Sequence, residues 1–156
     1  GADWGISSRF ITDEMGDFFL SLSVSYVDDE RRKDTDADPY VSIMNQERRL
    51  RSRSYLSLSW TKDDWSTGIS TSRIGSMGYY SSFAPNPRGR NKIDPYFDIG
   101  AFVRYDIEDG HYIGLSVSNL MDDAPTYNTD LGFPWFSEYY YSAVGREVFV
   151  TYKYTF

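Results

Sequence analysis

The sequence contains no cysteine, only one histidine and no long apolar run. Without cysteine, the protein has no disulfide framework, no thiol nucleophile and no zinc site with cysteine ligands. A transmembrane helix needs about 20 predominantly apolar residues, and no stretch of the chain meets this requirement. A membrane protein that crosses with strands is still allowed, because a transmembrane strand needs only about 9–11 residues.

Basic residues are also few: 16 Lys and Arg stand against 23 Asp and Glu, and the formal net charge is −7. We therefore expect no nucleic-acid partner, because such binding requires a basic stripe. The chain does not open with a basic segment followed by an apolar one. Any signal peptide is therefore expected to have been removed or to belong to a longer precursor.

Aromatic and small polar residues are abundant, and they alternate along much of the chain. Leu20, Leu22 and Val24 share one parity, for example, while Ser21 and Ser23 hold the other. Strict alternation is typical of a strand with one apolar and one polar face. The sequence predicts an all-β, antiparallel protein whose seven strands cover residues 4–10, 18–26, 55–60, 65–71, 97–105, 113–117 and 147–156.

The connections between these strands alternate between short and long. Residues 12–17, 62–64 and 107–110 are short and polar, whereas residues 28–50, 78–95 and 121–144 form long connections. Outer-membrane barrels have short periplasmic turns and long outer loops, so the pattern favours a transmembrane β-barrel. A soluble β-sandwich is the alternative, but a soluble domain rarely carries several such long loops.

Two further features favour the barrel. The polar parity is rich in Ser, Thr and Gly, as suits a wet lumen. The apolar residues of many strands end in an aromatic residue, as expected for the aromatic girdles that lie at the two membrane interfaces of a barrel. These rings are Trp4, Phe18, Tyr26, Trp60, Trp65, Tyr105, Tyr154 and Phe156.

Seven strands do not make a complete bacterial barrel, which has an even number of strands and both ends on the periplasmic side. An open sheet would also leave unpaired backbone groups in hydrocarbon. We therefore expect residues 1–156 to form about seven strands of a larger barrel, with the remaining strands supplied from elsewhere.

Two segments near the end of the chain resemble a known family. They are Val117-Ser-Asn-Leu-Met-Asp-Asp-Ala-Pro125 and Gly145-Arg-Glu-Val-Phe-Val-Thr-Tyr-Lys-Tyr-Thr-Phe156. Together they resemble the ending of TonB-dependent outer-membrane receptors, although Met121 stands where the family more often has Phe. Leu58-Ser-Trp60 and Asp63-Asp64-Trp65-Ser66 are similar to the strands that precede that ending. The resemblance implies the last seven strands of a 22-stranded barrel.

The resemblance also implies a function and partners. The whole protein would import a scarce nutrient (an oligosaccharide, siderophore, cobalamin or haem) across the outer membrane of a Gram-negative bacterium. A plug domain and a short box gripped by a TonB-type energy-coupling protein would belong to it, and neither is in this sequence. Its other partners would be the barrel-assembly machinery and lipopolysaccharide. The alternative is a small independent outer-membrane barrel with a binding, adhesion or structural role.

The last strand is the candidate signal for barrel assembly. Its apolar row could be recognised by strand addition before the barrel closes. The row consists of Val148, Val150, Tyr152, Tyr154 and Phe156. The alternative is an ordinary amphipathic edge strand.

The loop at residues 121–144 is the candidate substrate site because it is rich in rings. Aromatic faces stack on sugars and on planar chelates. The residues predicted to contact substrate are Tyr127, Trp135, Phe136, Tyr139, Tyr140 and Tyr141. The alternative is that the rings pack on neighbouring loops or the barrel rim, or lie in lipopolysaccharide.

Metal and catalytic sites have weaker support. Asp34, Asp36 and Asp38 have the opening spacing of an EF-hand calcium loop, but Pro39 replaces the required Gly. The spacing would allow a calcium ion in this outer loop, but a solvated acidic loop beside Arg31, Arg32 and Lys33 is the favoured interpretation. No other cofactor is expected. Nor is an enzyme, because the only histidine, His111, has no serine nucleophile beside it in the predicted strand.

The assembly role of the last residue can be tested by deleting Phe156. Deletion should lower the outer-membrane yield of the intact protein much more than it lowers the unfolding midpoint of protein already inserted. The reason is that the terminal row would act during assembly, before the barrel closes. A normal yield with a lowered midpoint would instead assign Phe156 a purely structural role.

Overall fold

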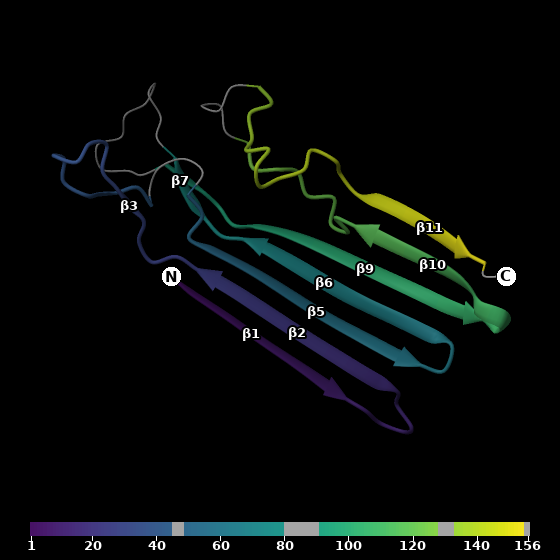
Figure 1. Ribbon diagram of the computed structural model, residues 1–156. Helices are drawn as coiled ribbons and strands as arrows, with labels where there is room; N and C mark the ends of the chain where they lie inside the picture. The colour runs from purple at the N-terminus through teal and green to yellow at the C-terminus, as the bar shows by residue number, and fades with distance from the viewer. Residues whose placement is uncertain (45–48, 80–90, 128–132, 155–156) are drawn as a thin grey trace.

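Seven long strands form one antiparallel sheet in the computed structural model, which describes residues 1–44, 49–79, 91–127 and 133–154 (Figure 1). The strands are β1 (Ala2–Phe10), β2 (Asp17–Tyr26), β5 (Ser52–Lys62), β6 (Trp65–Ile74), β9 (Tyr96–Ile107), β10 (His111–Ser118) and β11 (Glu147–Lys153). Each pairs with the next along the chain. The prediction of an all-β protein with seven antiparallel strands is therefore confirmed. The sheet is open, with β1 and β11 at its edges, so no closed barrel is shown.

Short and long connections lie at opposite ends of the sheet, as the turns and loops in Figure 1 show. We call these the turn end and the loop end. At the turn end, Asp63 and Asp64 join β5 to β6, and the 3-10 helix η1 (Glu108–Gly110) joins β9 to β10. Asp63 has a φ of 50°, a left-handed conformation that Asp adopts more readily than most residues.

Two of the long connections contain small ribbons that the alternation pattern did not predict. β3 (Arg31–Arg32) pairs with β4 (Val41–Ser42), and β7 (Met77–Tyr79) pairs with β8 (Asn91–Ile93). Strands of two or three residues are too short to show a periodicity in the sequence. No helix in the described part of the chain is both long and apolar enough to span a membrane.

The register of the sheet brings the apolar parities of all seven strands onto one face. One row of directly paired residues crosses the whole sheet and consists of Ser8, Leu20, Leu58, Ile69, Ala101, Val117 and Val148. The adjacent row on the other face begins with Ser7, Ser21, Ser57, Ser70 and Gly100. The sheet thus has an apolar face and a polar face. Phe19, Phe102 and Phe149 are exceptions, since they share one row of the polar face.

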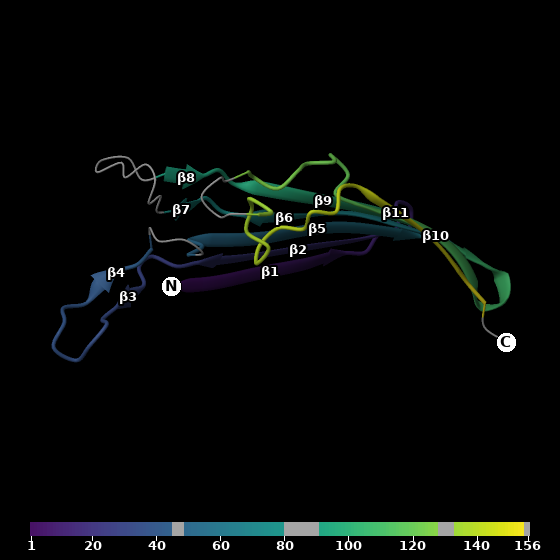
Figure 2. The same cartoon turned by 90° about the horizontal axis from the view of Figure 1, so that it is seen from above.

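Neither face is covered along most of its length. Figure 2 shows the long strands as a single layer that bends along its length. On the apolar face, Ile6 is 65% exposed, Val150 is 73% exposed and Leu115 is 42% exposed. Among the described residues, the buried apolar cluster is small and lies at the loop end. It contains Ile74, Met77, Ile93 and Tyr141, with Leu50, Tyr96, Phe136 and Tyr140 packed against it.

The turn between β1 and β2 is docked against the end of β5. The Thr12 hydroxyl donates to the Gly16 carbonyl at 2.7 Å, and the Trp60 indole N–H donates to the Met15 carbonyl at 2.7 Å. Gly16 has a φ of 85°, and a Cβ there would lie 2.5 Å from the Thr61 carbonyl oxygen. Both the backbone conformation and the close approach to β5 therefore require glycine.

Replacing this glycine should destabilise the sheet. Gly16→Ala should lower the free energy of unfolding by about 1–3 kcal/mol, because the new methyl group meets backbone atoms and the positive φ disfavours Ala. The matched control is Gly5→Ala, whose Cβ would lie 3.7 Å from its nearest neighbour, the Leu22 carbonyl oxygen. Denaturant midpoints of the two variants measure the difference, and similar midpoints would contradict the assigned role of Gly16.

Candidate functional site

Asn119 forms the start of the last long loop, immediately after β10. It is 6% exposed and has a φ of 48°, a left-handed conformation that Asn tolerates. Its side-chain amide donates to the Asp123 carbonyl at 2.9 Å and accepts from the Asp123 N–H at 2.9 Å. The Asn119 N–H donates to Asp98 Oδ1 at 3.1 Å, which ties the turn to β9. Asn119 therefore closes this turn by hydrogen bonds that an apolar residue could not make.

Asp122 joins the start of the loop to its end. Its Oδ1 accepts a hydrogen bond from the Arg146 N–H at 2.8 Å, and its Oδ2 lies 3.7 Å from Arg146 Nη2. A Cβ at Gly145 would lie 2.7 Å from Asp122 Oδ1, so the contact requires a glycine there or a shift of the carboxylate. The two sequence segments that carry the family resemblance are thus held together at the base of one loop.

The predicted substrate-contacting rings fall into two groups. Phe136, Tyr140 and Tyr141 pack into the buried cluster at the loop end, and Tyr141 is only 5% exposed. The Tyr141 ring meets the Tyr96 ring edge-on, with 5.2 Å between centroids. Burial, followed by the neighbouring Tyr140 and Tyr96, raises the pKa of Tyr141 above its ordinary value. These three rings pack on residues at the ends of the strands and in the loops, and their contact with substrate stays a prediction.

The second group of rings is exposed. Tyr127, Trp135 and Tyr139 are 65%, 41% and 72% exposed. The Trp135 ring lies 6.0 Å from the Tyr127 ring and 5.3 Å from the Phe133 ring, measured between centroids. This cluster is accessible to a ligand, and its contact with substrate stays a prediction.

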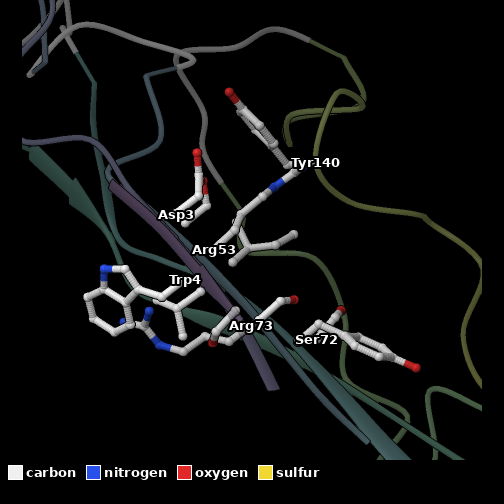
Figure 3. A pocket seen from close by; sticks show the side chains of 12 residues that line it. Asp3, Trp4, Arg53, Ser72, Arg73 and Tyr140 are labelled. Atoms are coloured by element: carbon white, nitrogen blue, oxygen red, sulfur yellow. The ribbon is translucent and has the colours of Figure 1, made fainter. Parts of the chain in front are cut away.

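A cavity on the polar face lies beneath the last loop, and sequence reasoning did not find it. It has a volume of about 480 Å³. Its lining includes Asp3, Ser25, Arg53, Tyr55 and Tyr140. Tyr140 comes from the loop, and the Arg53 guanidinium lies over its ring at 5.5 Å from the centroid. Figure 3 shows Arg53, Asp3 and Tyr140 on one side of the strands, and Trp4 and Arg73 on the other. Parity predicted which strand residues share this face, but not where the loop folds over it.

The three carboxylates of the predicted calcium loop do not converge. Asp34 pairs with Arg32 at 2.9 Å, and Asp36 pairs with Lys33 at 2.7 Å. Asp38 accepts hydrogen bonds from the N–H and the hydroxyl of Thr35. Within residues 1–44, 49–79, 91–127 and 133–154, no three His, Cys, Asp or Glu side chains form a group that could hold a metal ion. Calcium binding here stays an untested prediction.

The apolar row of β11 has the predicted orientation. Val148, Val150 and Tyr152 lie opposite Val117, Leu115 and Ile113 of β10, on the apolar face. All three are more than half exposed, at 59%, 73% and 63%. The Tyr154 ring packs on the His111 ring, with 4.1 Å between centroids, whereas Phe156 lies outside the described residues. The role of this row in assembly stays a prediction.

Comparisons with known proteins identified no family: no protein-family model, curated protein or solved structure matches the chain. The function proposed below therefore depends on the geometry of the sheet and on the resemblance carried by residues 117–125 and 145–156.

The link across the base of the loop can be tested at Asp122. Asp122→Ala should lower the free energy of unfolding by about 1–3 kcal/mol, because the Arg146 N–H loses its acceptor and because Ala disfavours the left-handed φ of 59° at this position. It should also speed hydrogen exchange at the Arg146 amide. Asp123→Ala is the control: it removes the same charge, but Asp123 takes part in this turn through its backbone. Equal exchange rates in the two variants would show that the carboxylate does not hold the loop closed.

Proposed function

We propose that this chain forms part of the wall of an outer-membrane β-barrel importer of the TonB-dependent type. Its apolar face would meet lipid, and its serine-rich face would line the lumen. The observation that carries the proposal is the register, which aligns the apolar residues of seven strands on one exposed face. Soluble monomers rarely expose so large a continuous apolar surface, whereas hydrocarbon covers it without a second protein layer.

The length of the strands supports a membrane setting. β1, β2, β5, β6 and β9 contain 9–12 residues. A strand of about 9–11 residues, tilted by about 45°, spans the hydrocarbon core of a bilayer. These five strands are therefore long enough to cross, whereas β10 and β11 contain 8 and 7 residues.

The position of the rings along the apolar face also supports a membrane setting. By register, Trp4, Tyr26 and Phe97 lie toward the loop end, and Trp60, Trp65, Tyr105 and Tyr152 lie toward the turn end. Aliphatic residues lie between them, as in the row from Leu20 to Val148. An aliphatic band between two aromatic belts is typical of transmembrane barrels.

Arg73 fits the same setting, although it is a charged residue on the apolar face. It lies near the loop end of β6, opposite Phe97. Its guanidinium lies 5.9 Å from the centroid of the Phe97 ring and donates to the Ser52 hydroxyl at 3.0 Å. Near a membrane interface, a long arginine side chain can keep its charge at the polar boundary.

The open edges of the sheet determine which partners the proposal requires. In hydrocarbon, the unpaired N–H and C=O groups of β1 and β11 would cost several kcal/mol each. We therefore propose that further strands complete the wall, inserted by the barrel-assembly machinery among lipopolysaccharide. By the sequence resemblance, the whole protein would also carry a plug domain, and a TonB-type protein would drive the import of its cargo. Oligosaccharide, siderophore, cobalamin and haem are the cargo classes that this resemblance allows.

Adjacent residues on β10 test which face meets lipid. Leu115→Arg should destabilise the bilayer-inserted intact protein by about 2–4 kcal/mol, because it places a charge at mid-membrane on the lipid face. Ser116→Arg, one residue later on the polar face, is the matched control and should be tolerated in a wet lumen. Unfolding titrations in lipid vesicles measure both variants. Equal losses at the two positions would remove the barrel proposal.

A further inference from the structure

The cavity beneath the last loop has the size and position of a small-molecule site. Its volume of about 480 Å³ lies within the range of about 300–1,000 Å³ that is usual for ligand pockets. It lies at the loop end of the polar face, where Tyr140 of the last loop closes over β5 (Figure 3). In the proposed barrel, this position would be reached from outside the cell.

Arg53 supplies a hydrogen-bond donor beside the ring of Tyr140. Its guanidinium lies 5.5 Å from the centroid of the Tyr140 ring. A guanidinium carries five N–H donors, and a cation–π contact with a ring does not use all of them. Arg53 makes no ion pair with the residues that the structure describes. The Arg53 side chain therefore presents a hydrogen-bond donor to the cavity.

Asp3 supplies the matching acceptor on the same row of the sheet. It lies opposite Ser25, and Ser25 lies opposite Arg53. Asp3 and Arg53 are thus two strand spacings apart, which is about 9.6 Å between backbones. The Ser25 hydroxyl between them donates to Asp3 Oδ1, which leaves the other carboxylate oxygen able to accept. A donor and an acceptor thus flank the cavity at a fixed spacing.

The next row of the polar face adds a ring and hydroxyl groups. Ser23, Tyr55 and Ser72 are paired side by side and all line the cavity. Tyr55 is 45% exposed, so part of its ring is accessible to a ligand. The lining therefore combines aromatic surface with uncharged hydroxyl groups.

The charges of the lining favour a neutral ligand. Asp3 and Arg53 carry opposite charges, and the second arginine of the lining, Arg73, is directed to the apolar face, where it contacts Phe97. An anionic chelate or a dicarboxylate would meet the Arg53 cation together with the Asp3 carboxylate, which would repel its second negative charge. A molecule with many hydroxyl groups can accept from Arg53, donate to Asp3 and place its C–H face against Tyr55.

We propose that this cavity is a subsite for a neutral carbohydrate, with sugar hydroxyls held between Asp3 and Arg53. The inference rests on the proposed function, and it selects oligosaccharide from the four cargo classes. It places recognition on the strands at residues 3, 53 and 55, as well as on the loop.

The experiment measures binding of the purified intact protein to an array of neutral oligosaccharides, with acidic oligosaccharides, haem and a ferric tricatechol complex as competing probes. At least one neutral oligosaccharide should bind, and Arg53→Gln and Asp3→Asn should each weaken that binding about tenfold or more, because each removes a charged hydrogen-bond partner. The matched control is Arg104→Gln. Arg104 also lies over a tyrosine ring, that of Tyr112, but at the turn end of the polar face.

The inference would be overturned if no neutral oligosaccharide bound at millimolar concentration, or if Arg53→Gln and Arg104→Gln weakened binding equally. Preferential binding of haem, the ferric complex or acidic sugars would overturn it as well. The unfolding midpoint of each variant separates lost binding from lost folding, and Asp3→Asn keeps the size of the side chain. Carbohydrate binding is measured on the purified protein, whereas the lipid-facing orientation of the sheet is tested by Leu115→Arg. The carbohydrate subsite and the barrel proposal can therefore fail independently.

Discussion

The structure depends above all on the register between neighbouring strands. Side chains alternate between the two faces of a strand, so a slip of one residue would move every apolar side chain of that strand to the polar face. In all six pairings, the residues of the apolar face of one strand lie opposite those of the apolar face of the next. A single row from Ser8 to Val148 therefore crosses the whole sheet. The separation into an apolar and a polar face follows from this agreement.

The turn end has the features that keep this register. Tight connections limit how far neighbouring strands can slide, and the β1–β2 turn is also bound to β5 through the Trp60 indole. The contacts of Gly16 with Thr61 leave no room for a side chain at that point. Local backbone geometry at one end thus supports the alignment of residues several strands away.

The loop end has a different construction, because its contacts join residues that are distant in the sequence. Asp122 holds the two ends of the last loop together, and Tyr141 packs on Tyr96 at the start of β9. These contacts bring Tyr140 over Arg53 and so create the cavity of the polar face. The small buried cluster of the described chain therefore positions a loop, whereas the large apolar face of the sheet is left exposed.

The sequence by itself determined the class of fold, the seven strands, the two faces and the alternation of short and long connections. All of these depend on a period of two residues and on local turn chemistry, which are visible in a single segment of chain. The two small ribbons were missed because strands such as Arg31–Arg32 are too short to show that period.

Only the tertiary structure decided which rings of the last loop are packed and which are exposed, because burial depends on what lies opposite each ring. Tyr141 and Trp135 are equally aromatic in the sequence, yet one is 5% exposed and the other 41%. It also separated Asp34, Asp36 and Asp38 onto different partners and brought Arg53 to Tyr140. Contacts of this kind require the closure of long loops, whose path is determined by packing and not by the local sequence pattern.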